Sequence, residues 1–557
     1  MTKKIELTAA VRTELEQIVG ASFVSNDRAM LTGYVWNTGV GKIPGDEKFA
    51  SIWPVAVVLP ATTEQVAAVV RCCLRHGLHF KAHSTGYGSM GHPATPETVV
   101  IDLRRMDMLE IDPDNRMAII GPYATAGMLQ AEALKHGLTC HIVGAGPAHS
   151  PLASATSLIG VGITSQGTSM NVRNLLAWEW VTPQGEIVRG GSAGSGCGWF
   201  ASDGPGPGVR GMIRGFFGAG GGLGVFTKIG YKLYPVPVRG PVETTGALPQ
   251  LGMRVPEHAG FFHAVWPDWN SHRDAAFELI DENITFGMLR MPPDHIGWTL
   301  TATNAEYVAR CRQGSLPPPA RPENDKSWTL LTLSRSAGEH AWRSSVIADI
   351  VRRTGGQLVD MEQSHQEVLL RNLFTSIYVP RVMRPSGGIT TTFGILDSFS
   401  FLPAAMAAGQ ACLGGQNRPG GALVEGGKEE HWSWPHEGRY LWSENIVNFD
   451  PADKTARTAA ARALLGHFAI SFRKPVGVLA LGVGPIMELQ GDTIGGPQHY
   501  VRQVKACMDP ANASQSKEYV IPHMPNILAK LLPLAKPVLL SAPVLGVMSR
   551  VVASKGL

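Results

Sequence analysis

Between residues 53 and 143, short apolar runs that are typical of strands alternate with segments in which apolar residues recur at helical spacing. The short apolar run Val55–Leu59 is typical of a buried strand, and apolar residues recur at helical spacing through Glu64–His76. The apolar run Val99–Leu103 predicts a second buried strand, and Thr125–His136 predicts a second helix. This order of elements predicts a βαβ arrangement in the first part of the chain.

Strand-like patterns continue further along the chain. The alternation that follows Gly224 predicts a strand with one buried face, and Gly314–Asn324, with three consecutive prolines, predicts a surface loop. Further elements are predicted as strands at Ala177–Thr182, Phe261–Trp269 and Trp328–Ser334, and as a helix at Glu339–Thr354.

The segment Lys81–Gly91 separates two of these strands and reads KAHSTGYGSMG. Closely spaced glycines let the backbone approach a ligand, and successive N–H groups with nearby hydroxyls can hold a phosphate. A plain glycine-rich turn explains the same pattern equally well. The run from Gly86 to Gly91 also matches G-x-G-x-x-G, but Pro93 and Pro96 disfavour the helix that a nicotinamide-binding loop requires.

A second glycine- and serine-rich segment begins at Gly144 and continues through Ser157–Gly167. It contains no charged residue between these positions, so its backbone can pack against a flat and largely apolar ligand. A third glycine-rich run, Gly218–Gly224, precedes the strand pattern noted above.

Composition narrows the class of protein. The 557 residues, 44% hydrophobic and 17% charged, predict an ordered protein with two or three domains. The net charge of +4 without a Lys/Arg block gives no indication of nucleic-acid binding. Seven scattered cysteines predict reduced thiols in a cytoplasm, and the N-terminal 20 residues predict an amphipathic helix without the apolar core of a signal peptide.

The ordered set of these segments resembles the FAD-binding domain of the vanillyl-alcohol oxidase / p-cresol methylhydroxylase family. The set comprises Pro54–Leu59, Ser84–Gly91, Ser157–Gly167, Glu179–Gly185 and Gly218–Pro235, within residues 50–237. The resemblance implies an α+β fold with a PCMH-type, two-subdomain FAD-binding domain and an α/β cap domain. The expected division is a helical segment at 1–49, the FAD-binding domain at 50–240, the cap at 241–470, a return to the FAD-binding domain at 471–522 and an apolar extension at 523–557.

The resemblance also implies FAD as the cofactor and assigns residues to it. The first loop contributes His83, Ser84, Thr85, Gly86, Tyr87, Gly88, Ser89 and Met90. The second loop contributes Ser157, Gly160, Gly162, Ile163 and Thr164, and the third contributes Gly224 and Val225. Some relatives link FAD covalently to a histidine of the first loop, but Gly88 occupies that position here. Other relatives link FAD to a histidine or tyrosine of the cap, and His436 and Tyr440 lie in that region. Non-covalent FAD is favoured.

Four residues are candidates for the chemistry. Tyr87 and Arg473 match a tyrosine and an arginine that face the substrate or the flavin in the family, and His431 and His436 belong to the segment HWSWPH, which suits a pocket wall. Phe472 and Leu152 replace a tyrosine and an acidic residue of the phenol-oxidising relatives, which puts 4-hydroxybenzyl substrates in doubt. Other histidines, among them His83, His149, His263 and His467, are more often structural. No metal site is expected.

The expected function is an FAD-dependent oxidoreductase that abstracts hydride from a C–H bond of a small aromatic or apolar alcohol. The alternatives are a 2-hydroxy-acid dehydrogenase that passes electrons to a separate carrier and a non-catalytic flavin-fold subunit. The expected partners are a small-molecule substrate, an electron acceptor (dioxygen or a redox protein) and a second copy of the chain. The basic and apolar extension at 523–557 predicts helical segments that lie on the inner face of a membrane, a partner subunit or the protein's own body, in an otherwise cytoplasmic protein.

Overall fold

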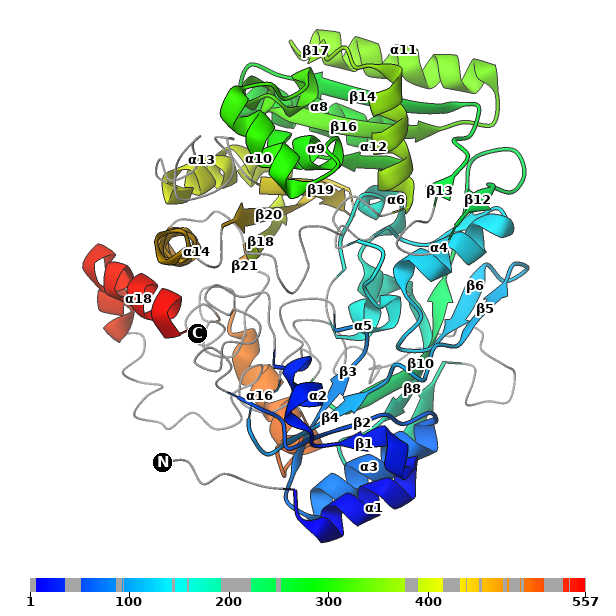
Figure 1. Cartoon of the computed structure of the whole chain (residues 1–557). Coiled ribbons are helices and arrows are strands. Elements are labelled where there is room, and N and C mark those ends of the chain that lie inside the picture. The colour runs from blue at the N-terminus through cyan, green and yellow to red at the C-terminus, as the bar shows by residue number, and fades with distance from the viewer. Residues whose placement is uncertain are drawn as a thin grey trace.

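The computed structural model divides into a lower half, which contains the N-terminal part of the chain, and an upper half, which we call the cap (Figure 1). It describes residues 7–35, 52–86, 93, 95–142, 146–157, 160–191, 222–246, 252–375, 389–413, 431–436, 438–449, 453–473, 478–479, 491, 495–514, 534–539 and 541–555.

The first subdomain of the lower half is a four-stranded sheet in the order β1-β2-β4-β3, with β2, β4 and β3 parallel. Its elements are α1 (Ala9–Val19), β1 (Val24–Ser25), α2 (Arg28–Thr32), β2 (Ala56–Val58), α3 (Thr63–Arg75), β3 (His79–His83) and β4 (Thr98–Asp102). Helix α3 begins at its N-cap Thr62 and packs with α1 in one apolar core against the sheet. The N-terminal helix predicted from the sequence is therefore an integral part of this subdomain.

The second subdomain is an antiparallel five-stranded sheet in the order β5-β6-β10-β8-β9. Its elements are β5 (Leu109–Asp112), β6 (Met117–Ile120), α4 (Ala126–Lys135), β7 (Leu138–Thr139), α5 (Pro151–Thr156), α6 (Ser165–Thr168), β8 (Leu175–Val181), β9 (Ile187–Gly190), β10 (Val225–Lys232) and β11 (Tyr234–Pro235). Strand β10 is central in this sheet, and six of its eight residues are buried. The expectation of one buried face is therefore wrong, because β10 is covered on both faces.

The cap is built on two four-stranded antiparallel sheets, β15-β16-β14-β17 and β19-β20-β18-β21, whose strands β15 and β19 lie side by side. Its elements are β12 (Thr244–Thr245), β13 (Gly252–Met253), β14 (Ala259–Val265), α8 (Trp269–Glu282), β15 (Gly287–Leu289), α9 (Pro293–Thr299), α10 (Asn304–Gln313), β16 (Ser327–Leu333), α11 (Ala337–Arg353), β17 (Gln357–Leu358), α12 (Gln363–Thr375), β18 (Ile389–Ser398), α13 (Leu402–Leu413), β19 (His431–His436), β20 (Tyr440–Asn448), α14 (Lys454–Arg473) and β21 (Val478–Leu479). Helices α8, α11 and α13 cover one face of the cap sheets through a common core.

Two details of the cap add to the sequence-based expectations. The proline-rich segment forms two short 3-10 turns, Pro318–Ala320 and Pro322–Asn324, and Pro319 and Ala320 are buried. Gly314, Ser315, Pro318, Arg321 and Glu323 are exposed, so the segment lies at the surface as predicted and is anchored in the cap by its few buried residues. Strand β21 pairs with β18, so the cap sheet extends beyond residue 470.

The C-terminal part returns to the lower half through α16 (Pro497–Met508). After α16, the N–H of Phe80 donates to the carbonyl of Ala513 (2.9 Å), so the chain runs beside β3. The last helix, α18 (Ala542–Lys555), lies at the edge of the molecule against α14 (Figure 1). None of the helices in the described ranges combines the length and the apolar character needed to cross a membrane.

Candidate functional site

The first glycine-rich loop leaves the end of β3, beside the end of the parallel strand β4. Ser84 and Thr85 are half-buried, and Gly86 has a φ of +69°, which favours glycine. A Cβ at this position would lie 2.7 Å from Nε2 of His83. The loop residues assigned to the cofactor at Tyr87, Gly88, Ser89 and Met90 lie outside the described residues.

The second loop is organised around a buried histidine. Nδ1 of His141 lies 2.7 Å from the hydroxyl of Thr168, and Nε2 lies 3.0 Å from the carbonyl of Gly160. The hydroxyl of Thr164 accepts a hydrogen bond from the N–H of Ile142 (2.9 Å), so the neighbouring backbone is also fixed. His141, which precedes the loop, thus contacts Gly160 within it and Thr168 directly after it. Its signal in the sequence is a polar residue inside the apolar run Leu138–Val143, which sequence reasoning missed.

Gly160 occupies the most crowded point of this loop. Its φ is +61°, and a Cβ there would lie 2.2 Å from Oγ of Ser154 and 2.4 Å from Cβ of Asn171. The N–H of Asn171 donates to the carbonyl of Gly160 (2.7 Å), and the hydroxyl of Tyr231 donates to the side chain of Asn171. The loop conformation therefore depends on glycine at position 160.

The third glycine-rich segment meets the C-terminal return. Gly224 has a φ of +84°, and a Cβ there would lie 2.2 Å from the carbonyl oxygen of Val181. Its N–H donates to the hydroxyl of Ser514 (2.8 Å). The side chain of Val225 is buried in the core of the first subdomain, so only its backbone remains to contact a ligand.

The cap is seated directly on the second loop. The N–H of Met288 in β15 donates to the carbonyl of Ile163 (3.0 Å), and a Cβ at Gly287 would lie only 2.6 Å from Cγ2 of Ile163. Gln166 extends the contact, because its side chain donates to the carbonyl of Ile280 (3.3 Å) and accepts from the hydroxyl of Thr285 (2.9 Å). The second loop and β15 therefore form the joint between the two halves.

The histidine-tryptophan segment of the sequence forms β19, which lies against α6 of the second loop. Trp434 and His436 are each only 2% exposed, and the His436 ring lies 5.7 Å from the Tyr440 ring. Trp434 in β19 pairs with Trp442 in β20. Leu441, the residue before Trp442, packs in the core on the face of the sheet that the helices cover. Strand alternation therefore places Trp434, Trp442 and His436 on the face of the sheet opposite α8 and α13.

The strand register and the bounds of α14 give the positions of the other two catalytic candidates in the cap. His431 pairs with Asn445, at an odd separation from His436 along the same strand, so the two histidine positions belong to opposite faces of the sheet. Arg473 is the last residue of α14, and Phe472 precedes it in the same helix. Leu152 lies in the core of the second subdomain on α5.

Burial keeps two histidines neutral: His141, just before the second loop, and His149, within it. Burial lowers the pKa of His141 to about 3 and that of His149 to about 4. Nδ1 of His149 bonds the carbonyl of Gly146, while Nε2 is buried and has no hydrogen-bond partner among the described residues. A buried polar atom of this kind requires a partner, and a bound ligand with polar groups would supply one. The segments Lys81–Gly91 and Leu138–Trp178 also contain no acidic residue, so an anionic ligand meets no like charge there.

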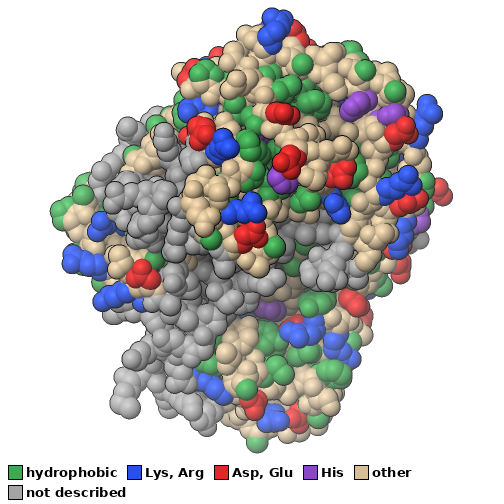
Figure 2. All heavy atoms as spheres, turned by 45° about the horizontal axis from the view of Figure 1, so that its top comes forward, with side chains coloured by type: hydrophobic (Ala, Val, Ile, Leu, Met, Phe, Trp, Pro, Cys, Tyr) green, Lys and Arg blue, Asp and Glu red, His purple; other side chains and the backbone are tan. Residues whose placement is uncertain are grey.

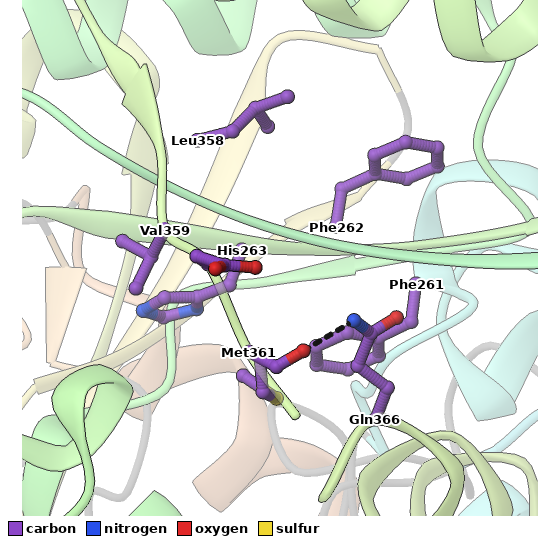
Figure 3. A pocket seen from close by; sticks show the side chains of 8 residues that line it. Phe261, Phe262, His263, Leu358, Val359, Met361 and Gln366 are labelled. Carbon is purple, nitrogen blue, oxygen red and sulfur yellow. Dashed lines mark hydrogen bonds between the residues drawn. The ribbon is translucent and has the colours of Figure 1, made fainter. Parts of the chain in front are cut away.

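A cavity of about 280 Å³ lies at the other edge of the cap, between β14 and α12 (Figure 3). It is lined by Phe261, Phe262, His263, Leu358, Val359, Asp360, Met361 and Gln366. Nδ1 of His263 bonds the hydroxyl of Thr329 (3.0 Å), and burial lowers the pKa of His263 to about 4. Strands β16 and β15 separate β14 from β19, so this cavity is roughly 14 Å from β19.

One group of potential metal ligands occurs within the described ranges. A carboxylate oxygen of Glu14, Sγ of Cys72 and a ring nitrogen of His76 lie within 4.8 Å of one another between α1 and α3. The carboxylate already bonds Arg75 and His76, and this holds the pKa of Glu14 at about 2. The group functions as an ion-pair cluster that joins the two helices.

Comparisons with known proteins match this geometry. Residues 54–191 match the family model of the FAD binding domain. (R)-6-hydroxynicotine oxidase of Paenarthrobacter nicotinovorans is 28% identical over 200 residues, which cover 35% of this chain and 40% of that protein. D-lactate dehydrogenase of Archaeoglobus fulgidus is 31% identical over 183 residues, which cover 32% of this chain and 38% of that protein. The structure of substrate-bound p-cresol methylhydroxylase matches with a TM-score of 0.69 at 18% identity, over 92% of this chain and 97% of that chain.

These matches define first a class, a two-domain flavoprotein with an FAD-binding half and a cap. More specifically, residues 54–191 are an FAD binding domain, and the chain has the fold of p-cresol methylhydroxylase, which confirms the resemblance drawn from the sequence. FAD is the cofactor of this domain, and the acid-free loops and the unpartnered Nε2 of His149 fit it. This chain spans less than half of the length of the curated relatives named above.

Proposed function

We propose that this protein is an FAD-dependent oxidoreductase that removes hydride from a C–H bond of a small aromatic or apolar alcohol. The observation that carries the proposal is the joint between Ile163 of the second flavin loop and Gly287 and Met288 of the cap, which brings β19 against α6. Ligand sites form preferentially at such domain interfaces. Bound FAD supplies the hydride acceptor.

The residues of the cap divide the remaining tasks. Trp434 and Trp442 offer an apolar wall that would orient an aromatic substrate, and His436 offers the imidazole that would accept the hydroxyl proton. Arg473, at the end of α14, is proposed to stabilise negative charge near the flavin or the substrate. Within the first loop, Tyr87 is proposed to face the substrate. The electron acceptor is dioxygen or a separate redox protein.

A second candidate is a 2-hydroxy-acid dehydrogenase. It is supported by the 31% identity to a D-lactate dehydrogenase over part of the FAD-binding domain. A hydroxy-acid substrate brings a carboxylate that requires a cation in the pocket, and Arg473 is the residue that would meet it. The two candidates therefore differ in the charge of the substrate.

Anaerobic mixing of the purified holoprotein with a substrate panel tests both candidates. The panel contains benzyl alcohol, vanillyl alcohol, D-lactate and L-lactate, and the absorbance of oxidised flavin is the readout. Bleaching by an aromatic alcohol supports the leading proposal, while bleaching by a lactate alone supports the second candidate. A protein that cannot be loaded with FAD would instead be the non-catalytic flavin-fold subunit.

A further inference from the structure

Helix α18 buries a serine and exposes several apolar side chains. In α18, Ser549 is fully buried, and its hydroxyl donates to the carbonyl of Leu545 (2.7 Å). Val547 is 54% exposed, and Met548 and Val551 are each 37% exposed. The helix packs on α14 and presents apolar side chains to the surroundings.

The short helical stretch before α18 has the same character. Leu534 is 75% exposed and Val538 is 63% exposed, which makes them the two most exposed large apolar residues in the described part of the chain. An apolar surface of this kind on one segment indicates an interaction site. We call this set of exposed apolar side chains the docking face; it comprises Leu534, Val538, Val547, Met548 and Val551.

The charged residues of the C-terminal segment all have one sign. Residues 523–557 contain Lys530, Lys536, Arg550 and Lys555 and no acidic residue. The whole chain has 49 Lys and Arg and 45 Asp and Glu, so removing these four cations leaves 45 against 45. The C-terminal 35 residues therefore carry the entire net positive charge of the protein.

The neighbouring helix adds to this field. Helix α14 contains Lys454, Arg457, Arg462 and Arg473 and no acidic residue, although Asp453 caps its first turn. Lys454 and Arg462 are exposed. Basic and apolar side chains occur together at the left edge of the molecule, where α14 and α18 lie (Figures 1 and 2).

We propose that the docking face binds an anionic membrane surface. Apolar side chains that enter the boundary of the acyl chains, surrounded by cations that attract acidic headgroups, are the two components of interfacial helix binding. A contact with a second copy of this chain is less favoured, because it would bring two surfaces of the same positive charge together.

Vesicle co-sedimentation of the full-length holoprotein tests the proposal. The probes are vesicles of phosphatidylcholine alone and vesicles with equal amounts of phosphatidylcholine and phosphatidylglycerol. We expect binding to the mixed vesicles that weakens as the salt concentration rises. No binding to the mixed vesicles, or equal binding to both kinds, would overturn the proposal.

Two pairs of variants, each with a matched control, test whether vesicle binding depends on the docking face. Arg550→Glu should weaken binding to the mixed vesicles by about thirtyfold, since it replaces a cation with an anion near the surface. Arg254→Glu, at an arginine that is 79% exposed in the cap, makes the same change of net charge and should alter binding by less than about twofold. Val547→Glu is paired with Val188→Glu in β9, where the valine is 38% exposed, and only the first should weaken binding.

Thermal unfolding and flavin content of each variant show that the fold is retained. Equal losses from Arg550→Glu and Arg254→Glu would mean that only net charge matters and would contradict a docking face. Sedimentation analysis tests the other possible occupant of the docking face, a second copy of this chain. If the wild type self-associates, Val547→Glu dissociates it, and neither protein binds vesicles, the face is a contact between copies and the proposal is overturned.

Discussion

The ammonium group of Lys505 lies 2.5 Å from a carboxylate oxygen of Asp509, one turn further along α16, and both side chains are at most 2% exposed. The same ammonium group donates to the carbonyls of Gly222 (2.7 Å) and Ser514 (2.6 Å). The hydroxyl of Ser514 in turn accepts from the N–H of Gly224. A single buried cation thus ties the C-terminal helix to the segment that precedes β10.

Replacing Lys505 with methionine should remove the hydrogen bonds that connect α16 to the carbonyls of Gly222 and Ser514. Asp509 would remain as a buried charge without its partner, and such losses cost about 3–5 kcal/mol of unfolding free energy. Denaturant unfolding of Lys505→Met measures the loss, and a lower retention of FAD on gel filtration reports the displaced loop. The matched control is Lys135→Met, at a lysine that is 56% exposed, which should change stability by less than about 1 kcal/mol.

Gly160 and Gly167 lie seven residues apart in the second loop but should respond differently to alanine. A Cβ at Gly160 would overlap Ser154 and Asn171 at a positive φ, whereas no atom of the described residues lies within 4 Å of a Cβ at Gly167. Gly160→Ala should therefore purify with much less FAD than Gly167→Ala. Flavin-to-protein absorbance ratios give the answer, and equal ratios would show that this loop does not shape the cofactor site.

Glu179 links the stability of the two subdomains to pH. Its side chain accepts hydrogen bonds from Thr63 (2.6 Å) and Arg189 (2.8 Å). Burial raises the pKa of Glu179, but these hydrogen bonds outweigh it and hold the pKa below 4.5. The stabilisation is therefore fully present above pH 4.5 and is lost as the pH falls through the lower pKa of the folded state.

Glu179→Gln tests this dependence. At pH 7 the variant should lose about 1–3 kcal/mol of unfolding free energy, because hydrogen bonds to a charged group are lost. The difference from the wild type should shrink when unfolding is repeated at acid pH. A constant difference across the pH range would rule out the ionised carboxylate as the source, and Glu257→Gln, at an exposed position, serves as the control.

The seating of the cap can be disturbed at a single glycine. Gly287→Ala places a Cβ 2.6 Å from Cγ2 of Ile163, and such overpacking costs about 1–3 kcal/mol. The added variant Ile163→Ala should relieve the clash, so the double variant should be more stable than the two single losses predict. Gly338→Ala, with open space around its Cβ, controls for the substitution itself. Additive losses would show that cap and loop are not in contact here.

The two histidines of β19 should contribute unequally to the rate of flavin reduction. His436 belongs to the face with Trp434 and Trp442, whereas His431 belongs to the other face. His436→Asn should slow flavin reduction by about 100-fold, within the range of a lost general base, while His431→Asn should leave the rate nearly unchanged. Rapid-mixing absorbance with saturating substrate measures both rates. The reverse order would place the substrate on the helix-covered face.

The strands and helices of the FAD-binding half could be predicted because each carries a strong local signal. Helix α3, predicted at Glu64–His76 and observed at Thr63–Arg75, has a threonine N-cap and an apolar face. The buried strand at Val99–Leu103 is observed at Thr98–Asp102. The cap was less predictable, because β15 and β17 are only three and two residues long and depend on pairing with distant strands.

The candidate site could be predicted only in part. The glycines at 86, 160 and 224 could be found, since positive φ angles leave glycine as the favoured residue. The network around His141 could not, because its partners Thr168 and Gly160 meet it only after the loop has folded back. The joint between Ile163 and Gly287 spans more than a hundred residues, and nothing in either local sequence announces the contact.

The most direct test of the central claim is the anaerobic reduction of the bound flavin by substrate, with a protein that has been shown to hold one FAD per chain. The account predicts that at least one small aromatic or apolar alcohol bleaches the flavin absorbance. It also predicts that the absorbance returns when dioxygen or an artificial electron acceptor is added. A fully loaded protein whose flavin stays oxidised with every alcohol and every 2-hydroxy acid, yet is reduced normally by dithionite, would contradict it.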